Sequence, residues 1–361
     1  MNFEPSAEQT MLRDTVNNVL ASHSSADSTG LWPVMADLGL LGLTFSESEG
    51  GQGAGPIEAM IVMSELGAST ARVPLLDCAY LPGDLVAEAA SPAQRRELLP
   101  KIAAGQLRPA FAHEEPRSRW PLRVLSTSAV RQGSTWRVTG RKSPVLFGDE
   151  ADLLIVSAAV TDGIRLFLVD PAGAGVSRHG SATYDGMRAA DIVFTAAPAE
   201  PLASLRAEEA IEAALVAAQA ALCAEAVGAM TEALHITAEY LCARKQFGVP
   251  LRTFQALSHR AADMHIAVAM AHGMSVYASM ALADGVIDQS IASRAKLRVG
   301  RSARYVGQEA VQLHGGIGMT VDYPVGQYFA RLTAIEQTFG NSSDHLRFLM
   351  GRVAEYDMVD L

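Results

Sequence analysis

The order of apolar and polar residues divides the chain into three zones that differ in period. In residues 1–108 apolar positions recur at helical spacing over Glu8–Leu20, Leu31–Leu40 and Pro56–Leu66, and a further helix is expected behind Ser91. A glycine-rich stretch, LGLLGLTFSESEGGQGAG, separates the second helix from the third and predicts a sharp irregular turn. The first zone is therefore predicted to be a helical domain.

The second zone, residues 109–200, changes to short runs rich in β-branched residues, which Gly, Asp and Pro separate. Such runs predict the strands of a small antiparallel β domain. The runs are VLSTSAVRQGSTWRVTG, DLLIVSAAV, IRLFLVD and AADIVFT.

The third zone, residues 201–361, returns to long helices. Ala207–Ala243 keeps its larger apolar residues near helical spacing, and Leu257–Ala283 and Ile287–His314 follow it. A last helical segment runs beyond Asp344. Four long helices with short links predict an antiparallel bundle. The chain is thus expected to be mostly α-helical, with a β insert between two helical domains.

Composition narrows the class of protein. The 361 residues are 49% hydrophobic and only 19% charged, so part of the apolar excess is expected at contacts between subunits. The net charge of −10 argues against a nucleic-acid partner. No run reaches the ~18 uninterrupted apolar residues of a membrane helix, and the first residues carry no secretion signal. Three scattered cysteines without metal spacing fit a reduced, cytoplasmic setting.

Three possible signals of catalysis or ligand binding are weak because of where the residues stand in the chain. Ser293–Lys296 matches S-x-x-K but lies within a predicted helix without the partner motifs. Gly140–Ser143 ends like a phosphate-binding loop but stands among predicted strands. The histidines form no H-x-x-x-H pair with an acidic residue, which argues against a metal site.

Two segments of the third zone carry more information. The first is RKQFGVPL, residues 244–251, followed by Phe254. Its glycine and proline are typical of a helix stop. Arg244 and Phe247 stand three residues apart on the expected last turn, so the cation and the ring would point the same way. An arginine beside aromatic rings suits a pyrophosphate with a stacked heterocycle, and a plain capped corner is the alternative.

The second segment is QLHGGIGMT, residues 312–320, followed by Tyr323. Three glycines in four residues after a long helix permit positive φ and close approach of the backbone. A flexible turn between helices would explain the same residues. The joint occurrence of both segments favours a binding role.

Three stretches together resemble motifs of the acyl-CoA dehydrogenase family, in the family's order and over nearly the whole chain. They are RKQFGVPLRTFQ, QLHGGIGMTVDYPV and LGLLGLTFSESEGGQG. The resemblance implies a helical N-terminal domain, a middle β domain and a C-terminal four-helix bundle, in a tetramer with FAD at subunit contacts. It also implies a reaction in which a carboxylate takes the α-proton of an acyl-CoA thioester and the flavin takes the β-hydride.

In the family, the first two of these motifs reach the FAD of a neighbouring subunit, and an electron-transfer flavoprotein is the acceptor. The resemblance therefore gives a set of expected cofactor-binding residues. They are Arg244, Gln246, Phe247, Phe254, Gln312, His314, Gly315 and Gly316.

The β domain departs from the family where it should line the flavin of its own subunit. A T-E-P-x-x-G-S-D-like loop is replaced by EEPRSRW, residues 114–120, and a W-I-T-N-like strand by PVLF, residues 144–147. The hydroxyl donor and the aromatic wall are both missing. Pro144 also lacks a backbone donor.

The family's catalytic base is missing as well. Counted without gaps from Arg331, the usual glutamate falls on Gly340. Counted back from Arg244, the alternative position in the first bundle helix falls on Ala218. No catalytic residue is therefore expected in this chain.

These departures favour the subunit without the base in a heterotetrameric (α2β2) acyl-CoA dehydrogenase, similar to those of actinobacteria that act on steroid side-chain CoA thioesters. A homologous partner would supply the glutamate, the flavin wall and most of the acyl-CoA site, and the FAD would be shared. Two alternatives stay open. One is an active homotetramer whose base has moved to Glu336, Asp344 or Glu225, and the other is a scaffold that keeps the fold without FAD.

Overall fold

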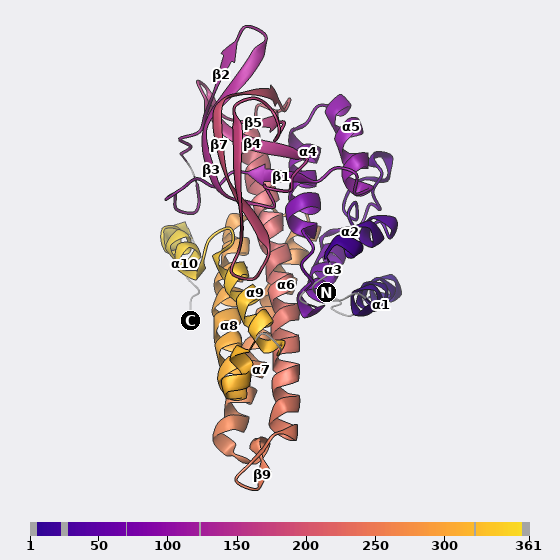
Figure 1. The fold of residues 1–361 in the computed structure, drawn as a ribbon, viewed down its shortest axis with the longest axis vertical. Coiled ribbons are helices and arrows are strands. Elements are labelled where there is room, and N and C mark those ends of the chain that lie inside the picture. The colour runs from indigo at the N-terminus through magenta and orange to yellow at the C-terminus, as the bar shows by residue number, and fades with distance from the viewer. Residues whose placement is uncertain (1–5, 23–27, 70, 123, 321–322, 356–361) are drawn as a thin grey trace. The chain divides into compact units, whose positions relative to one another are not determined.

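Helices fill both ends of the chain, and the long strands are confined to its middle. The structure is a computed structural model that describes residues 6–22, 28–69, 71–122, 124–320 and 323–355. Figure 1 shows its elements in chain order. The expected class, mostly α-helical with a β insert, is confirmed.

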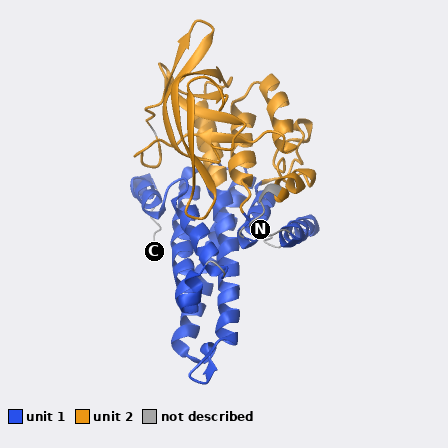
Figure 2. Ribbon diagram, in the orientation of Figure 1, with its two compact units in different colours: residues 1–25, 56–71, 219–361 blue, residues 26–55, 72–218 orange. Residues whose placement is uncertain are grey.

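The chain folds as two compact units, which Figure 2 colours separately. The first unit comprises residues 1–25, 56–71 and 219–361, and the second comprises residues 26–55 and 72–218. The N-terminal helices are thus distributed over both units, while the strands of the middle zone all belong to the second. The three-part division at residues 108 and 200 stays a prediction.

The N-terminal zone contains the four expected helices and one helical segment that the pattern does not predict. Ser91 begins the last of them with a capping box, in which its hydroxyl and the Gln94 side chain each accept a backbone N–H of the other residue. The unexpected segment is buried almost all round, so it shows no amphipathic period. The helices are α1 (Ala7–Ser22), α2 (Ser28–Asp37), α3 (Pro56–Ser69), the unexpected α4 (Leu81–Ala89) behind a π-helical turn (Leu76–Tyr80), and α5 (Pro92–Ala103).

The β domain is one sheet of seven strands: β1 (Pro109–Ala112), β2 (Ser128–Gln132), β3 (Thr135–Leu146), β4 (Leu153–Val160), β5 (Gly163–Val169), β6 (Val176–Ala182) and β7 (Arg188–Pro201). The sheet closes on itself, because β3 joins β2 to β7, β5 joins β7 to β4, and β4 returns to β2. Val138, Val156 and Phe167 are fully buried in its core. The expected antiparallel pairing dominates, although β4 pairs in parallel with β1 and β2.

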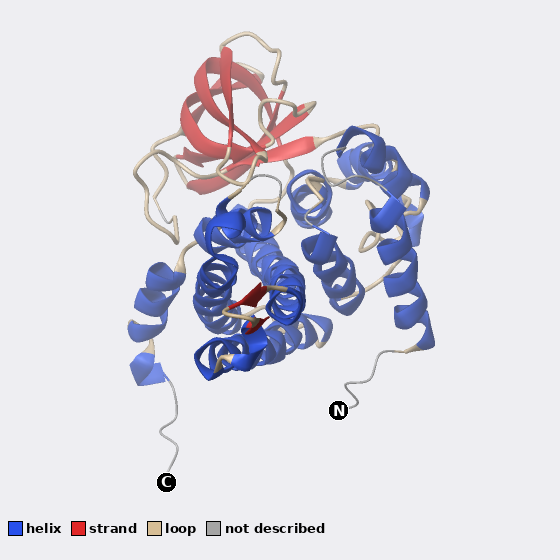
Figure 3. Ribbon diagram, turned by 60° about the horizontal axis from the view of Figure 1, so that its bottom comes forward, coloured by secondary structure: helices blue, strands red, loops and turns tan. Residues whose placement is uncertain are grey.

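The bundle consists of α6 (Ala207–Ala243), α7 (Gln255–Ala283), α8 (Gln289–His314) and α9 (Val325–Gln337), seen nearly end-on in Figure 3. The first three match the expected ranges closely. The fourth was expected beyond Asp344, but that segment forms the short α10 (Ser342–Met350), which packs on α8. Helix α9 takes the fourth place because Val325, Tyr328, Leu332 and Ile335 line one buried face at helical spacing.

Helices α3 and α6 cross at two glycines of the first unit. A Cβ at Gly67 would lie 1.9 Å from the Glu225 carbonyl oxygen, and one at Gly228 would lie 1.8 Å from the Ser64 carbonyl oxygen. Any side chain at either position would collide with backbone. The two backbones therefore touch, which lets α6 bury its small residues closely against α3.

Among the described residues, two helices are long and apolar enough to cross a membrane, although no uninterrupted apolar run predicts them. The most apolar stretch of α6 is 83% buried inside the protein, as in a core helix. The corresponding stretch of α7 is only 33% buried. Much of the apolar surface of α7 therefore lies outside the core.

Candidate functional site

The first motif segment forms a β-hairpin and not the last turn of a helix. Helix α6 ends at Ala243, and β8 (Lys245–Gln246) then pairs with β9 (Val249–Pro250) at the end of the bundle, marked by β9 in Figure 1. Phe247 and Gly248 have φ of 53° and 85°, as the two central residues of a tight hairpin turn require. Gly and Pro do follow the helix end as expected, but the chain reverses through a hairpin.

Phe247 stands at the tip of this hairpin and is 92% exposed. The expectation that Arg244 shares a helical turn with it was therefore wrong. The Phe247 ring instead meets the Phe254 ring edge-on, with centroids 6.1 Å apart, and Arg244 and Gln246 are exposed along the hairpin. A positive φ is unfavourable for an aromatic residue, and full exposure adds to that cost. Such a residue is suited to contact a second molecule.

The second motif segment begins where α8 ends at His314 and continues as a 3-10 turn, Gly315–Met319. Gly315 has φ 65° and ψ −141°, a conformation that is open to glycine alone. Gly316 has no such constraint, and no atom of the described residues lies within 4 Å of the place its Cβ would take. Gln312 and both glycines are exposed, so backbone and amide groups of this loop face outward. Val321 and Asp322 of the motif lie outside the described residues.

His314 is placed differently from the other expected cofactor-binding residues. It is only 4% exposed, and its Nδ1–H donates to the Ala310 carbonyl at 2.8 Å. Its ring lies against Tyr240 and Tyr323, with centroids 4.4 and 4.9 Å away. Because Tyr240 precedes the hairpin by a few residues, this cluster brings the two motif segments to the same end of the bundle. His314 supports the glycine loop. Tyr323 was named with the second motif segment, whereas the sequence pattern gave no sign of Tyr240.

Gly340, the predicted position of the family's usual base, lies in the short loop between α9 and α10. Gly340 has φ 94° and Phe339 has φ 53°, so the chain reverses sharply here. Asn341 then caps α10: its side chain accepts from Ser343 N and Asp344 N, and Asp344 accepts from Asn341 N. The small polar residues of the loop therefore serve as a capping box, the plain explanation of this stretch.

A buried polar network holds this loop in place. Gln219 Nε2 donates to Phe339 O at 3.3 Å, and Gln289 donates to Gln219 at 2.7 Å. His345, which is fully buried, contacts the same carbonyl through Nε2 and Ser293 Oγ through Nδ1. Since a carbonyl only accepts, Nε2 carries the proton and Nδ1 accepts from the hydroxyl. Burial and the nearby charge of Lys296 lower the pKa of His345 to about 3, which keeps the ring neutral.

Lys296 fastens the other side of the loop. Its ammonium group donates to Ile335 O at 2.7 Å and to Thr338 O at 2.8 Å, which are carbonyls at the end of α9. This position completes the S-x-x-K match, and the lysine is a structural residue there. At the second possible position of the base, Ala218 is buried in α6 and offers no functional group.

The three carboxylates considered as relocated bases all form hydrogen bonds or ion pairs with other residues of the chain. Glu225 is 3% exposed and accepts two hydrogen bonds from Arg331, at 2.6 and 2.9 Å. Glu336 is 4% exposed, accepts from Ser342 N at 3.0 Å and lies 3.7 Å from Arg304. Asp344 closes the capping box and pairs with Arg347 at 2.9 Å. Each carboxylate therefore has a structural partner.

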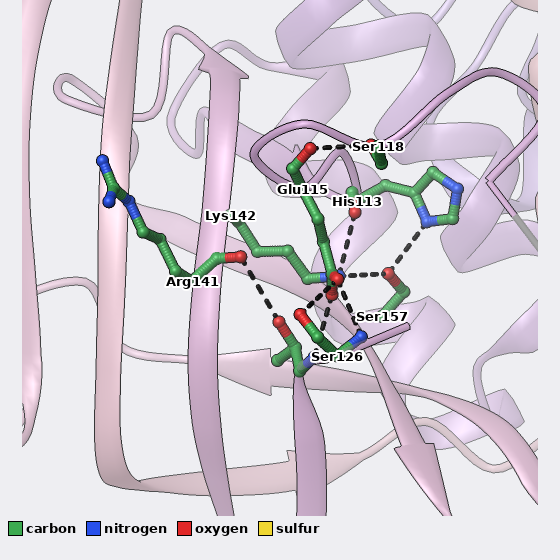
Figure 4. A network of polar contacts seen from close by, with 8 residues as sticks. His113, Glu115, Ser118, Ser126, Arg141, Lys142 and Ser157 are labelled. Carbon is green, nitrogen blue, oxygen red and sulfur yellow. Dashed lines mark hydrogen bonds and ion pairs between the residues drawn. The ribbon is translucent and has the colours of Figure 1, made fainter. Parts of the chain in front are cut away.

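In the second unit, the segment that should line a flavin is tied down by a buried ion pair, drawn in Figure 4. Glu115 accepts from Ser126 N, Ser126 Oγ and Thr127 N at 2.6–2.9 Å, and from Lys142 Nζ at 3.0 Å. Lys142 has no exposed surface and also donates to His113 O and Ser157 Oγ. Burial raises the pKa of Glu115, but these hydrogen bonds and the Lys142 charge outweigh it and lower it to about 2.

The second departure of the β domain lies at the end of β3. Phe147 is the one aromatic residue of the PVLF stretch, and it is 6% exposed with φ 53°. Its ring is therefore packed inside the unit and forms no outward wall. Pro144 offers no backbone N–H. The residues of this β domain do not fit the flavin contacts that the family resemblance implies, whereas the hairpin and the glycine loop of the first unit do.

The helical ends, the closed β sheet and the bundle with its glycine loop define the fold of a flavin-dependent dehydrogenase. The chain belongs to the acyl-CoA dehydrogenase family. The family profile of the acyl-CoA dehydrogenase N-terminal domain matches residues 6–106, and that of the C-terminal domain matches residues 209–354. Family membership supports an FAD-dependent oxidoreductase as the class of protein.

Among relatives, the acyl-CoA dehydrogenase FadE28 of Mycobacterium tuberculosis is 30% identical over 98% of this chain and 99% of its own length. A chain of the Tcur3481-Tcur3483 steroid ACAD (G363A variant) is 33% identical, with a TM-score of 0.87 over 96% of this chain and 98% of that chain. A chain of the ChsE4-ChsE5 complex from Mycobacterium tuberculosis has the same fold, with a TM-score of 0.90 at 24% identity over 99% of this chain and 100% of that chain.

Proposed function

We propose that this chain is the subunit without a catalytic base in a heteromeric FAD-dependent acyl-CoA dehydrogenase. The observation that carries the proposal is the loop between α9 and α10, where Gly340 stands in place of the family's glutamate at φ 94° and buried hydrogen bonds to Phe339 O hold the backbone. The homologous partner supplies the glutamate, the wall of the flavin and most of the acyl-CoA site. The steroid relative supports a steroid side-chain CoA thioester as the substrate class.

In this proposal the first unit binds the part of the FAD that protrudes from the partner. Arg244 pairs with the pyrophosphate, Phe247 and Phe254 cover a ring, and Gln246 lies beside them. Gln312, Gly315 and Gly316 bring backbone and amide groups close to the dinucleotide, and His314 keeps their loop in position. The FAD, when bound, supplies the hydride acceptor, and an electron-transfer flavoprotein removes the electrons in the cytoplasm.

Both alternatives account for fewer observations. A homotetramer with a relocated base needs a free carboxylate, and Glu225, Glu336 and Asp344 are held by Arg331, Ser342 N and the α10 cap. A scaffold without FAD leaves the exposed, positive-φ Phe247 and the open surroundings of Gly316 without a reason. The shared cofactor explains both, because the strain and the missing side chain serve a contact with another molecule.

The test is co-expression with a homologous acyl-CoA dehydrogenase chain that carries the glutamate, followed by purification and a flavin-to-protein ratio. We expect a complex with half as many FAD molecules as chains, and the single chain without flavin or activity. Arg244→Ala should strip FAD from the complex, while Arg252→Ala, which changes another exposed arginine nearby, should retain it. Gly316→Ala should leave folding unchanged but lower the flavin content.

Two results would overturn the proposal. One is an isolated chain that binds one FAD per protomer and oxidises an acyl-CoA. The other is the absence of both complex and flavin after co-expression, which favours the scaffold.

A further inference from the structure

A small cavity lies inside the first unit, between helices α1, α3, α6 and α7. It gives the centre of a water molecule about 60 Å³ of space. Because one water needs about 10–15 Å³ of such space, the cavity has room for roughly four to six water-sized groups. Its apolar wall is formed by side chains of α3 and α6, namely Met60, Ile61, Ala224 and Val227. The cavity therefore has the size of a very small organic molecule.

The cavity exists because small side chains meet there from three helices. Ser64 of α3, Ala224 of α6 and Ser275 of α7 all line it, and none of them is long enough to fill the space. Helices α3 and α6 already touch through their backbones at Gly67 and Gly228, so they cannot move closer together to close it. The space is thus part of the packing of this unit.

A buried hydroxyl group beside this cavity lacks a hydrogen bond. Ser275 lines the cavity and is 2% exposed, and its hydroxyl has no hydrogen-bond partner among the described residues. Burying a hydroxyl group without a partner is unfavourable. Ser64 supplies a second hydroxyl group to the same cavity. A molecule in the cavity can therefore provide the hydrogen bond that the chain does not.

Two opposite charges also line the cavity. Arg13 Nε lies 3.7 Å from Glu65 Oε1, which is too far for a hydrogen bond. The Arg13 side chain is 44% exposed and that of Glu65 only 19%. Burial raises the pKa of Glu65 above its ordinary value, and the Arg13 charge offsets this effect only in part. The Glu65 carboxylate is therefore incompletely neutralised by the chain, and both groups can bind a third molecule.

The arrangement of these groups fits a small zwitterion. Glu65 and Ser275 are mostly buried, whereas Arg13 and His272, which also lines the cavity, are more exposed and mark the side open to solvent. The ammonium group of a ligand finds acceptors in Glu65 and Ser275, and a carboxylate finds a donor in Arg13. A ligand with a single charge would bring that charge close to a like charge, because Arg13 and Glu65 lie side by side.

We propose that this cavity binds a small amino acid, a zwitterion of about the size of alanine, with its ammonium group at Glu65 and its carboxylate at Arg13. The apolar side chain of the ligand lies against Met60 and Val227. Alanine has about as many non-hydrogen atoms as the cavity has room for. The bound molecule contacts residues of four helices and so links α1 to the bundle.

Isothermal titration calorimetry of the full chain with L-alanine tests this assignment. We expect one saturable site per chain. The temperature of thermal unfolding should rise with the L-alanine concentration, because the ligand binds only the folded state. Ethylamine lacks only the carboxylate of L-alanine, and propionate lacks only its ammonium group. Each should bind about tenfold more weakly or worse, since it loses a charge-assisted hydrogen bond.

Four variants locate the bound molecule. Glu65→Gln keeps the shape of the side chain but removes its charge, and should weaken L-alanine binding about tenfold or more. Ser275→Ala should weaken it about fivefold without lowering the unfolding temperature, because the hydroxyl has no partner to lose. The controls Glu58→Gln on α3 and Ser279→Ala on α7 make the same changes outside the cavity lining and should bind L-alanine like the wild type. If Glu65→Gln does not fold, the comparison of Ser275→Ala with Ser279→Ala decides.

Three results would overturn the proposal. The absence of saturable L-alanine binding would mean that the cavity holds water only. Propionate or ethylamine that binds as tightly as L-alanine would exclude a zwitterion as the ligand class. Unchanged L-alanine binding in Ser275→Ala would place the bound molecule elsewhere. These measurements need neither flavin nor a partner subunit, so their outcome is independent of the heteromeric function.

Discussion

Replacing Lys142 by methionine tests the buried ion pair that ties down the β domain. The ammonium group is fully buried and donates to His113 O at 2.9 Å, Glu115 Oε1 at 3.0 Å and Ser157 Oγ at 3.1 Å. Methionine fills a similar volume but donates nothing, so the Glu115 carboxylate remains buried without its counter-charge. Breaking a buried ion pair from one side costs roughly 3–5 kcal/mol, a large share of the about 5–15 kcal/mol that stabilises a typical protein.

The tryptophans make the assay specific for the unit concerned. Trp32, Trp120 and Trp136 are the three tryptophans of the chain, and all belong to the second unit. Their fluorescence during urea unfolding therefore follows that unit alone. We expect Lys142→Met to lower its free energy of unfolding by about 3–5 kcal/mol without changing the dependence on urea.

Arg141→Met is the matched control, because Arg141 is the neighbour of Lys142 on β3 (Figure 4). Its side chain is 55% exposed and pairs with Asp191. Its loss should be far smaller. Glu115→Gln combined with Lys142→Met should lose less than the sum of the two single losses, since the partners act as a unit. A Lys142→Met loss below about 1 kcal/mol, or strict additivity in the double variant, would refute the reasoning.

Three further predictions concern the predicted base position, the buried His113 and two helix glycines. Gly340→Glu should yield no acyl-CoA-dependent reduction of an artificial electron acceptor. A glutamate at position 340 would be strained at φ 94°, and the β domain would still lack the flavin wall. Activity in the isolated variant would contradict this prediction. Burial and then the Lys142 charge lower the pKa of His113 from 6.5 to about 3, so the unfolded state binds a proton that the folded state does not, and stability falls as pH drops from 6.5 towards 3. The difference between the tryptophan-monitored pH profiles of the wild type and His113→Phe should therefore change by about 1.4 kcal/mol per pH unit in that window, and a constant difference would exclude a neutral buried His113. Gly228→Ala should lower the free energy of unfolding by about 1–3 kcal/mol, because the added methyl group pushes α3 away from α6. Gly273→Ala should instead raise the free energy of unfolding of the isolated chain by about 0.5–1 kcal/mol. Circular dichroism during thermal unfolding measures both changes, and equal effects would mean that the chain's own packing explains both glycines.

Much of the helical framework could be predicted because the period of the apolar residues sets it. Helix α6 has the predicted bounds, and α7 and α8 begin and end within two residues of theirs. The segment over α4 was missed because it is buried on nearly all sides and shows no polar face. The hairpin after α6 was taken for a simple helix stop, because a phenylalanine at positive φ is rare and the sequence gives no sign of it.

Residue identity allows candidate site residues to be predicted from the sequence, whereas three-dimensional contacts cannot be. Counting along the chain predicts that Gly340 and Ala218 stand where the family has its catalytic carboxylate. It does not reveal that Gln219 and His345 come from distant segments to hold the loop, nor that Tyr240 and Tyr323 enclose His314. The burial of Lys142 was not predicted because a lysine is expected at the surface, and only its partners show why it is buried.

The distribution of unfavourable features between the two parts of the site argues for a function in a complex. Around Gly340 the chain holds its own backbone, because the cap, Lys296 and the Gln219 network bind carbonyl and N–H groups of the loop. At the hairpin and on α7 the opposite holds. Phe247 is strained and 92% exposed, and Gly273 weakens its helix without relieving a contact in the described part of the chain. A chain that had merely lost activity gains nothing from such features. Their free-energy cost is offset only when another molecule covers them, which is why we propose that this chain acts through contacts with a partner and a shared flavin.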